Sequence, residues 1–350
     1  MIKQKQFMGW MFAGLVATSA IAGCSSAQSQ ADDAAQSDKS EAKLTLVSYA
    51  VTQSAYEKII PQFTEQWKAK TGQDVVIEQS YGGSGSQTRA VIDGLEADVV
   101  ALALALDTKK IEEAGLIQPG WEQELPNESI AHKSVVALVK RDDGVKVSQW
   151  SDLAKEGIEP ITANPKTSGG ARWNFLALWG SVSQAGGTEQ QAEAFTEKVF
   201  QNVPVLPKDA RESSDVFYQQ GQGNVLINYE NEVLLAKQKG ESTPYIVPTD
   251  YNISIDSPVA LVDANVDKNG TRKVAQAFAE YLFTPEAQKE FAQAGFRPID
   301  PTVEKEFASQ YPEIKKLYTV KDLGGWDKIQ AKFFDDGTVF DKMMTKNNQK

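Results

Sequence analysis

The stretch SYGGSGSQTRAVIDGLEADVVALALALD, residues 80–107, decides the fold class of this chain. It opens on a turn of small residues at 80–86, continues in a helical pattern to about Leu95, and ends in the apolar run 98–106. An apolar residue at nearly every position is typical of a parallel strand that is covered on both faces of its sheet. The stretch therefore predicts a turn, a helix and a buried strand.

The alternation of strands and helices continues outward in both directions. Upstream, residues 44–49 and 74–79 predict strands, and between them apolar residues from Tyr56 to Trp67 recur at helical spacing. Downstream, a strand at 257–262 precedes a long helix from about Thr271. This pattern favours an α/β fold with parallel sheets. The alternation also runs through 109–115, 134–140, 148–157 and 160–163.

Length and composition limit the possible functions. The 350 residues suggest two domains at roughly 150 residues each, and 41% hydrophobic with 24% charged residues is ordinary globular composition. The net charge of −11 and the lack of a run of Lys and Arg argue against a nucleic-acid partner. One cysteine and one histidine exclude a disulfide framework and a Cys/His zinc site, so we expect no metal and no cofactor.

The amino terminus predicts an export signal that ends at a lipid attachment site. Lys3 and Lys5 precede an apolar run at 7–22, which is shorter than the roughly 20 residues that span a bilayer. Residues 21–24 resemble a lipobox, so we expect a signal peptide at 1–23 and a lipid on Cys24. The alternative is an ordinary signal peptide with an incidental cysteine. Residues 24–42 are mostly Ser, Gln, Ala and Asp, which predicts a flexible tether to a folded body in the periplasm or at the cell surface.

Two Gly/Ser turns at helix starts indicate an anion site. The first is the turn at 80–86, and the second is PKTSGGAR, residues 165–172, which precedes a helical pattern at 173–179. Free backbone N–H groups and the helix dipole attract an anion to such a position. Neither turn matches a P-loop, a dinucleotide fingerprint or a hydrolase elbow. Their places in two separate strand–helix units suggest one oxyanion held between two lobes.

Five segments carry a resemblance to a known family. They are the stretch 80–107, ITANPKTSGGARWNFLALWG at 161–180, VLINYENEVLLA at 225–236, FRPID at 296–300 and LGGW at 323–326. Together they resemble the sulfate/thiosulfate-binding proteins of bacterial ABC importers, over residues 44 to about 340. The resemblance implies a two-lobe type II periplasmic-binding-protein fold with a ligand cleft between the lobes. We expect lobe 1 at 43–131 and 253–350, and lobe 2 at 132–252.

The resemblance also implies which residues bind, since that family holds its anion with uncharged hydrogen-bond donors. The chain departs from the family pattern at Tyr229, where a Trp is usual, at Tyr81 in place of His, and at Ala50 and Val51 in place of Asp-Pro. Arg172 is expected to support the site rather than to touch the ligand. The expected ligand-binding residues are Ser84, Ser168, Gly169, Gly170, Ala210 and Tyr229.

The protons carried by each oxyanion favour sulfate. Sulfate only accepts hydrogen bonds at neutral pH, whereas phosphate keeps a proton that needs an acceptor, and a site made of donors alone leaves that proton unpaired. The absence of an Asp at position 50 fits a site made of donors, but the phenol of Tyr229 can also accept. Sulfate is therefore the first candidate, thiosulfate the second and phosphate the third.

We expect a monomeric, lipid-anchored solute-binding protein that delivers its anion to an ABC permease and performs no covalent chemistry. An exported ester hydrolase is the rival, disfavoured because the sequence has no metal-ligand cluster and no Ser/His pair; an adhesion or structural lipoprotein is a third possibility. His132 is expected on the surface or in packing. Glu230 and Glu232 are expected to cap a helix at 233–238 rather than to form a catalytic pair.

Overall fold

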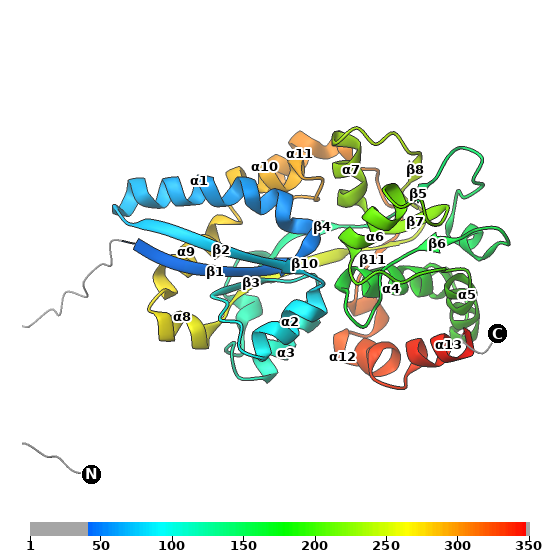
Figure 1. Cartoon of the computed structure of the whole chain (residues 1–350), viewed down its shortest axis with the longest axis horizontal. Helices are drawn as coiled ribbons and strands as arrows, with labels where there is room; N and C mark the ends of the chain where they lie inside the picture. Colours follow the sequence, from blue (N-terminus) through cyan, green and yellow to red (C-terminus); the bar gives the residue numbers. More distant parts are fainter. Residues whose placement is uncertain (1–40, 348–350) are drawn as a thin grey trace, which may run out of the picture. The chain divides into compact units, whose positions relative to one another are not determined.

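The computed structural model describes residues 41–347 (Figure 1). The predicted signal peptide at 1–23, the predicted lipid site Cys24 and nearly all of the predicted tether lie outside the described residues. The last two positions of that tether, 41 and 42, already belong to the first strand, Glu41–Tyr49. None of the helices within residues 41–347 is both long enough and apolar enough to cross a membrane.

The larger sheet has five strands in the order β2-β1-β3-β10-β4. Helices α1 and α10 cover one face and helices α2 and α3 the other (Figure 1). Alternate side chains of β1 point to opposite faces of the sheet. Leu44 belongs to the same hydrophobic cluster as Phe63 of α1, and Val47 belongs to the same cluster as Val91 of α2. The elements of this part are β1 Glu41–Tyr49, α1 Gln53–Thr71, β2 Asp74–Gly82, α2 Ser84–Ile92, β3 Val99–Ala101, α3 Ala105–Glu113, β4 Ile130–Ser134, β10 Ile255–Leu261, α8 Asp263–Asn269, α9 Arg272–Tyr281, α10 Pro285–Gln293 and α11 Pro301–Phe307.

The smaller sheet has four strands in the order β6-β7-β5-β8. Helix α4 is buried on all sides over residues 169–180, and its Arg172 and Asn174 side chains are satisfied by an ion pair and by hydrogen bonds. Its Asn174 donates to the carbonyl oxygen of Ile227 at 2.9 Å, which fixes the helix to β7. The elements are β5 Val136–Lys140, β6 Pro160–Ile161, α4 Gly169–Ser183, α5 Glu189–Gln201, α6 Ala210–Tyr218, β7 Val225–Tyr229, α7 Glu230–Gln238 and β8 Tyr245–Ile246.

Two chain segments connect the sheets. Strand β4 ends at Ser134 and β5 begins at Val136, so the segment 134–140 contributes to both sheets. The chain returns through β9, Asn252–Ile253, into β10. Because β10 enters from the other sheet, it runs antiparallel to β3 and β4, and β7 is likewise antiparallel to β5. The prediction of parallel sheets is therefore wrong for these pairs, although β1 is parallel to β2 and β3.

The C-terminal segment packs on the smaller sheet's helices. The ring centroids of Phe333 and Phe340 lie 5.4 Å and 6.3 Å from that of Phe175 in α4, and Lys346 pairs with Glu197 of α5 at 3.0 Å. The expected division grouped all of 253–350 with the larger sheet, whereas these aromatic side chains complete the apolar surface of α4 and α5. The segment contains β11 Leu317–Tyr318, which pairs with β9, then α12 Trp326–Ile329, a π-helical turn Gln330–Phe334 and α13 Val339–Asn347.

Candidate functional site

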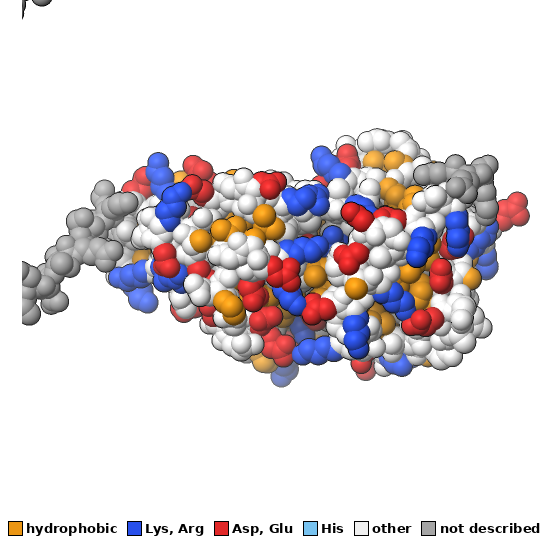
Figure 2. All heavy atoms as spheres, turned by 90° about the horizontal axis from the view of Figure 1, so that it is seen from below, with side chains coloured by type: hydrophobic (Ala, Val, Ile, Leu, Met, Phe, Trp, Pro, Cys, Tyr) orange, Lys and Arg blue, Asp and Glu red, His pale blue; other side chains and the backbone are white. Residues whose placement is uncertain are grey.

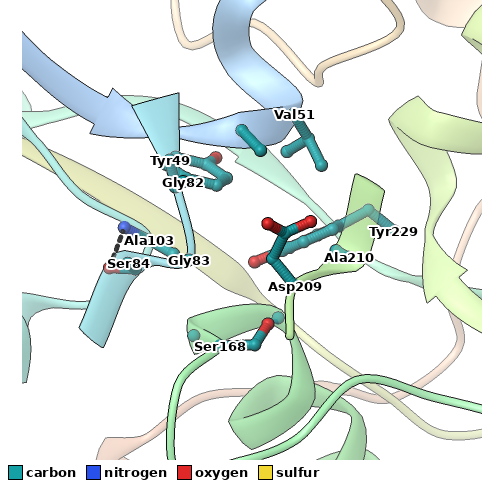
Figure 3. Close-up of a pocket in the computed structure, with 13 residues that line it drawn as sticks. Tyr49, Val51, Gly82, Gly83, Ser84, Ala103, Ser168, Asp209, Ala210 and Tyr229 are labelled. Atoms are coloured by element: carbon teal, nitrogen blue, oxygen red, sulfur yellow. Dashed lines mark hydrogen bonds between the residues drawn. The ribbon is translucent and has the colours of Figure 1, made fainter. Parts of the chain in front are cut away.

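A small pocket lies where several helices begin (Figure 3). It is lined by the first residues of α2, α4 and α6 and by the 3-10 turn Ala50–Thr52 that leads into α1. About 190 Å³ in and at the mouth of the pocket is free of protein atoms. The lining residues are Tyr49, Ala50, Val51, Gly82, Gly83, Ser84, Ala103, Ser168, Gly169, Gly170, Asp209, Ala210 and Tyr229, which include all six expected ligand-binding residues.

Ser84 begins α2, and its hydroxyl is engaged inside the protein. The hydroxyl donates to Oδ2 of Asp107 at 2.6 Å and accepts from the backbone N–H of Ala103 at 3.1 Å. The hydroxyl donor that the sequence suggested is therefore already used. No acceptor within residues 41–347 takes the backbone N–H of Ser84, so this N–H is the donor that the first turn can offer.

The second turn brings α4 into close contact with the rest of the pocket. The Ser168 hydroxyl accepts from the N–H of Ala171 at 3.3 Å as the helix cap, which leaves its own hydrogen available. A Cβ atom on Gly169 would lie 2.7 Å from Cβ of Ala103, and one on Gly170 would lie 2.7 Å from Cε2 of Tyr229. Only glycine allows these backbone N–H groups to approach so closely, and neither has an acceptor among the described residues.

Helix α6 begins at Ala210, after the capping residue Asp209. Oδ1 of Asp209 accepts from the N–H of Glu212 at 2.9 Å, and the N–H of Ala210 has no acceptor in the part of the chain that the structure describes. Asp209 is 5% exposed, and its carboxylate points into the pocket (Figure 3). Sequence reasoning missed this residue, although an Asp directly before a helix start is a common cap.

Tyr229, the last residue of β7, is fully buried at the pocket. Its ring centroid lies 6.0 Å from that of Tyr49, and its hydroxyl has no hydrogen-bond partner within residues 41–347. Burial raises the pKa of Tyr229 well above its usual value, so the phenol stays protonated and can donate. The residue that replaces the family's usual Trp therefore keeps a donor at the site.

Arg172 does not line the pocket and acts on it through Asp107. Its Nη1 pairs with Oδ1 of Asp107 at 3.0 Å, with both side chains almost completely buried, and its Nε donates to the carbonyl oxygen of Pro165 at 2.9 Å. Asp107 thereby joins Arg172 of α4 to Ser84 of α2. The indole N–H of Trp173 adds a bond to the carbonyl oxygen of Ala103 at 2.8 Å. These buried contacts link helices of the two sheets around the pocket.

The electrostatics of the pocket come from dipoles rather than from cations. Its lining contains no Lys, Arg or His, and its one charged side chain is that of Asp209. On the face shown in Figure 2, basic and acidic side chains are interspersed. Among residues 41–347 no group of three or more His, Cys, Asp or Glu could hold a metal ion. The converging helix starts can therefore attract an anion through N–H groups and dipoles, each dipole contributing roughly 0.3–2 kcal/mol.

The other titratable residues considered in the sequence have structural positions. His132 is buried with its ring centroid 4.2 Å from that of Phe296, and burial lowers its pKa to about 3. Glu230 and Glu232 lie in the first turn of α7, which begins at Glu230 rather than at 233. They form bidentate ion pairs with Arg297 and Arg211, respectively, so neither resembles half of a catalytic pair.

Comparison with known proteins places these features in context. Residues 44–297 match the family model of bacterial extracellular solute-binding proteins. The chain is 63% identical over 345 residues to a sulfate-binding protein of Synechocystis sp., covering 97% of each chain. It is 36% identical over 304 residues to a thiosulfate-binding protein of Pseudomonas aeruginosa, covering 86% of this chain and 92% of that one. The solved sulfate-binding protein SubI of Mycobacterium tuberculosis H37Rv is similar with a TM-score of 0.77 and 36% identity, over 84% of this chain and 99% of that one.

Proposed function

This chain belongs to the bacterial extracellular solute-binding proteins and, among them, to the sulfate- and thiosulfate-binding proteins of ABC importers; from this we propose that it captures sulfate and delivers it to an importer. Thiosulfate is the second candidate ligand. The chain is a binding protein rather than an enzyme, as its relatives are. The rival hydrolase interpretation is therefore set aside.

The observation that carries the proposal is the convergence of free donors on one small pocket without a cation. The backbone N–H groups of Ser84, Gly169, Gly170 and Ala210, the Ser168 hydroxyl and the Tyr229 phenol bind the oxygens of the anion. Each such bond to a charged group contributes about 1.5–3 kcal/mol. Only the excess over the cost of anion dehydration and of protein closure appears as affinity.

The cleft closes by movement of two lobes, one around each sheet, about three crossings of the chain: at Val135, between β9 and β10, and between α11 and β11. The contacts of α4 with Asp107 and Ala103 support this, because they lie beside the pocket and join elements of the two sheets. The C-terminal helix α13 moves with the second lobe, on which it packs. Helix α12 lies against both lobes, because Trp326 packs on Trp173 of α4 and Asp327 pairs with Lys109 of α3 at 2.6 Å. The open and closed states then differ in the surface that contacts the permease.

A lipid on Cys24 anchors the protein, which acts as a monomer outside the cytoplasm. The support is the lipobox-like sequence at 21–24 and the position of the cysteine at the expected cleavage point. Labelling of growing cells with a radioactive fatty acid should mark the wild-type chain and not Cys24→Ser. Equal labelling of both chains would contradict the anchor and leave the binding proposal intact.

A thermal-unfolding panel on the chain from residue 25 onward tests the ligand. Sulfate at 100 times its dissociation constant should raise the free energy of unfolding by about 2.7 kcal/mol, thiosulfate is expected to act in the same way, and chloride should have no effect. Molybdate tests a larger tetrahedral dianion in the same pocket. A larger effect of phosphate than of sulfate would overturn the ligand assignment, and no response to any oxyanion would overturn the proposed function.

A further inference from the structure

The carboxylate of Asp209 is an acceptor in a pocket otherwise built of donors. Only one of its two oxygens is used within the described residues: Oδ1 accepts from the N–H of Glu212 at 2.9 Å, and Oδ2 has no hydrogen-bond donor there. Figure 3 shows the carboxylate directed into the space that Tyr49, Ser168 and Tyr229 surround. The buried side chain therefore presents an unpartnered, negatively charged oxygen to the ligand.

No Lys, Arg or His within residues 41–347 forms an ion pair with this carboxylate. The neighbouring Arg211 is occupied by Glu232, with Nη2 to Oε1 at 2.8 Å and Nε to Oε2 at 2.9 Å. The N-terminal dipole of α6 offsets part of the charge, but the capping bond that makes this possible uses only Oδ1. Capping alone would be served by Ser or Asn, which carry no charge.

The free oxygen Oδ2 interacts differently with the two classes of ligand. Against sulfate, which has no proton, Oδ2 lies opposite another acceptor, and the like charges repel each other. Against monohydrogen phosphate, the ligand's O–H can donate to Oδ2 in a charge-assisted bond, roughly twice as strong as a neutral one. The same atom therefore weakens the binding of proton-free dianions and accepts the hydrogen bond of a protonated oxyanion.

We propose that the free carboxylate oxygen of Asp209 accepts the proton of a protonated tetrahedral oxyanion, so that the pocket takes monohydrogen phosphate as a second ligand class beside proton-free dianions. The inference rests on the proposed function, because it assumes that the oxyanion accepts hydrogen bonds from Ser168, Gly170 and Ala210. It makes Asp209 the residue that sets the selectivity between the two classes. The bond that forms is the phosphate O–H to Oδ2, and no proton leaves the ligand.

Calorimetric titration of the wild-type protein, Asp209→Asn and Asp209→Ser near pH 8 tests the proposal, with sulfate, selenate and inorganic phosphate as probes. Asp209→Asn keeps the cap through its amide oxygen and places an amide N–H where Oδ2 was. Asp209→Ser keeps the cap through its hydroxyl and removes the second oxygen. Both variants should bind phosphate at least about 10-fold more weakly. Asp209→Asn should bind sulfate and selenate about 10-fold more tightly than the wild type, and Asp209→Ser should bind them at least as tightly as the wild type.

The outcomes separate the inference from the function on which it rests. Opposite changes for phosphate and for the two proton-free dianions support the role of Asp209. Parallel changes for all three probes, or no phosphate binding to the wild type at millimolar concentration while sulfate binds, overturn it and leave sulfate capture in place. Failure of the wild type to bind sulfate overturns the proposed function itself. Unfolding of both variants at the wild-type temperature shows that the cap is intact.

Discussion

Removal of the Tyr229 hydroxyl is expected to change stability and affinity in opposite directions. The hydroxyl is fully buried and has no partner within residues 41–347. An unsatisfied buried hydroxyl costs about 1–3 kcal/mol, so Tyr229→Phe should raise the free energy of unfolding of the ligand-free protein by up to that amount. In the complex the same change removes a hydrogen bond to a charged group, worth about 1.5–3 kcal/mol, so sulfate should bind roughly 10- to 100-fold more weakly.

Urea titration without ligand and calorimetric titration with sulfate measure the two effects. Tyr56→Phe is the matched control, because the Tyr56 hydroxyl is also buried without a partner in the described chain. The Tyr56 ring packs against Phe278 and Phe291, and the residue does not line the pocket. It should stabilise the protein to a similar extent and leave the dissociation constant unchanged.

The affinity loss of Tyr229→Phe should be the same at pH 6 and pH 9, because burial raises the pKa of Tyr229 well above its usual value and the phenol donates throughout. A dissociation constant within about threefold of the wild type would refute the assignment of Tyr229 as a donor. A loss of affinity in Tyr56→Phe of the same size would show that the effect is not local to the pocket.

Three further changes test the rest of the site and its surroundings. Gly170→Ala would place a Cβ atom 2.7 Å from Cε2 of Tyr229, so sulfate affinity should fall at least about 10-fold by calorimetry; unchanged affinity would show that the pocket tolerates the methyl group. Arg172→Met leaves Asp107 buried and unpaired, so the free energy of unfolding should fall by about 3–5 kcal/mol in urea titration, and adding Asp107→Asn should recover much of it. Burial lowers the pKa of His132 to about 3, below its usual value near 6.5, so the unfolded chain alone binds this proton between those values. Stability should therefore decrease as pH falls from about 6.5 toward 3, by about 1.4 kcal/mol per pH unit, and His132→Phe should lose this part of the slope in unfolding curves recorded across that range.

The helix starts that form the pocket could be predicted because their signals are local. Small residues between a strand and a helix pattern define the turns at 80–86 and 165–172, and the structure begins α2 at Ser84 and α4 at Gly169. Capping bonds and positive helix ends depend on a few neighbouring residues. The six residues carried over from the family resemblance accordingly line one pocket.

Other features depended on contacts between distant segments. The turn at 80–86 alone would leave the Ser84 hydroxyl free to bind a ligand, but in the structure this hydroxyl donates to Asp107. Asp209 lines the pocket because α6 packs beside it. No local pattern distinguishes an Asp that merely caps a helix from one whose second oxygen faces a ligand.

The sequence by itself determined the α/β class, the helix starts and the types of donor, since these follow from periodicity, caps and turns within a few residues. The tertiary structure alone decided the antiparallel place of β10, the packing of the C-terminal helices on α4 and α5, and which polar atoms remain unpaired at the pocket. The direction of a strand after a crossing, and the partner that each polar atom takes, depend on residues far apart in the chain. Neither can therefore be predicted from a local sequence pattern.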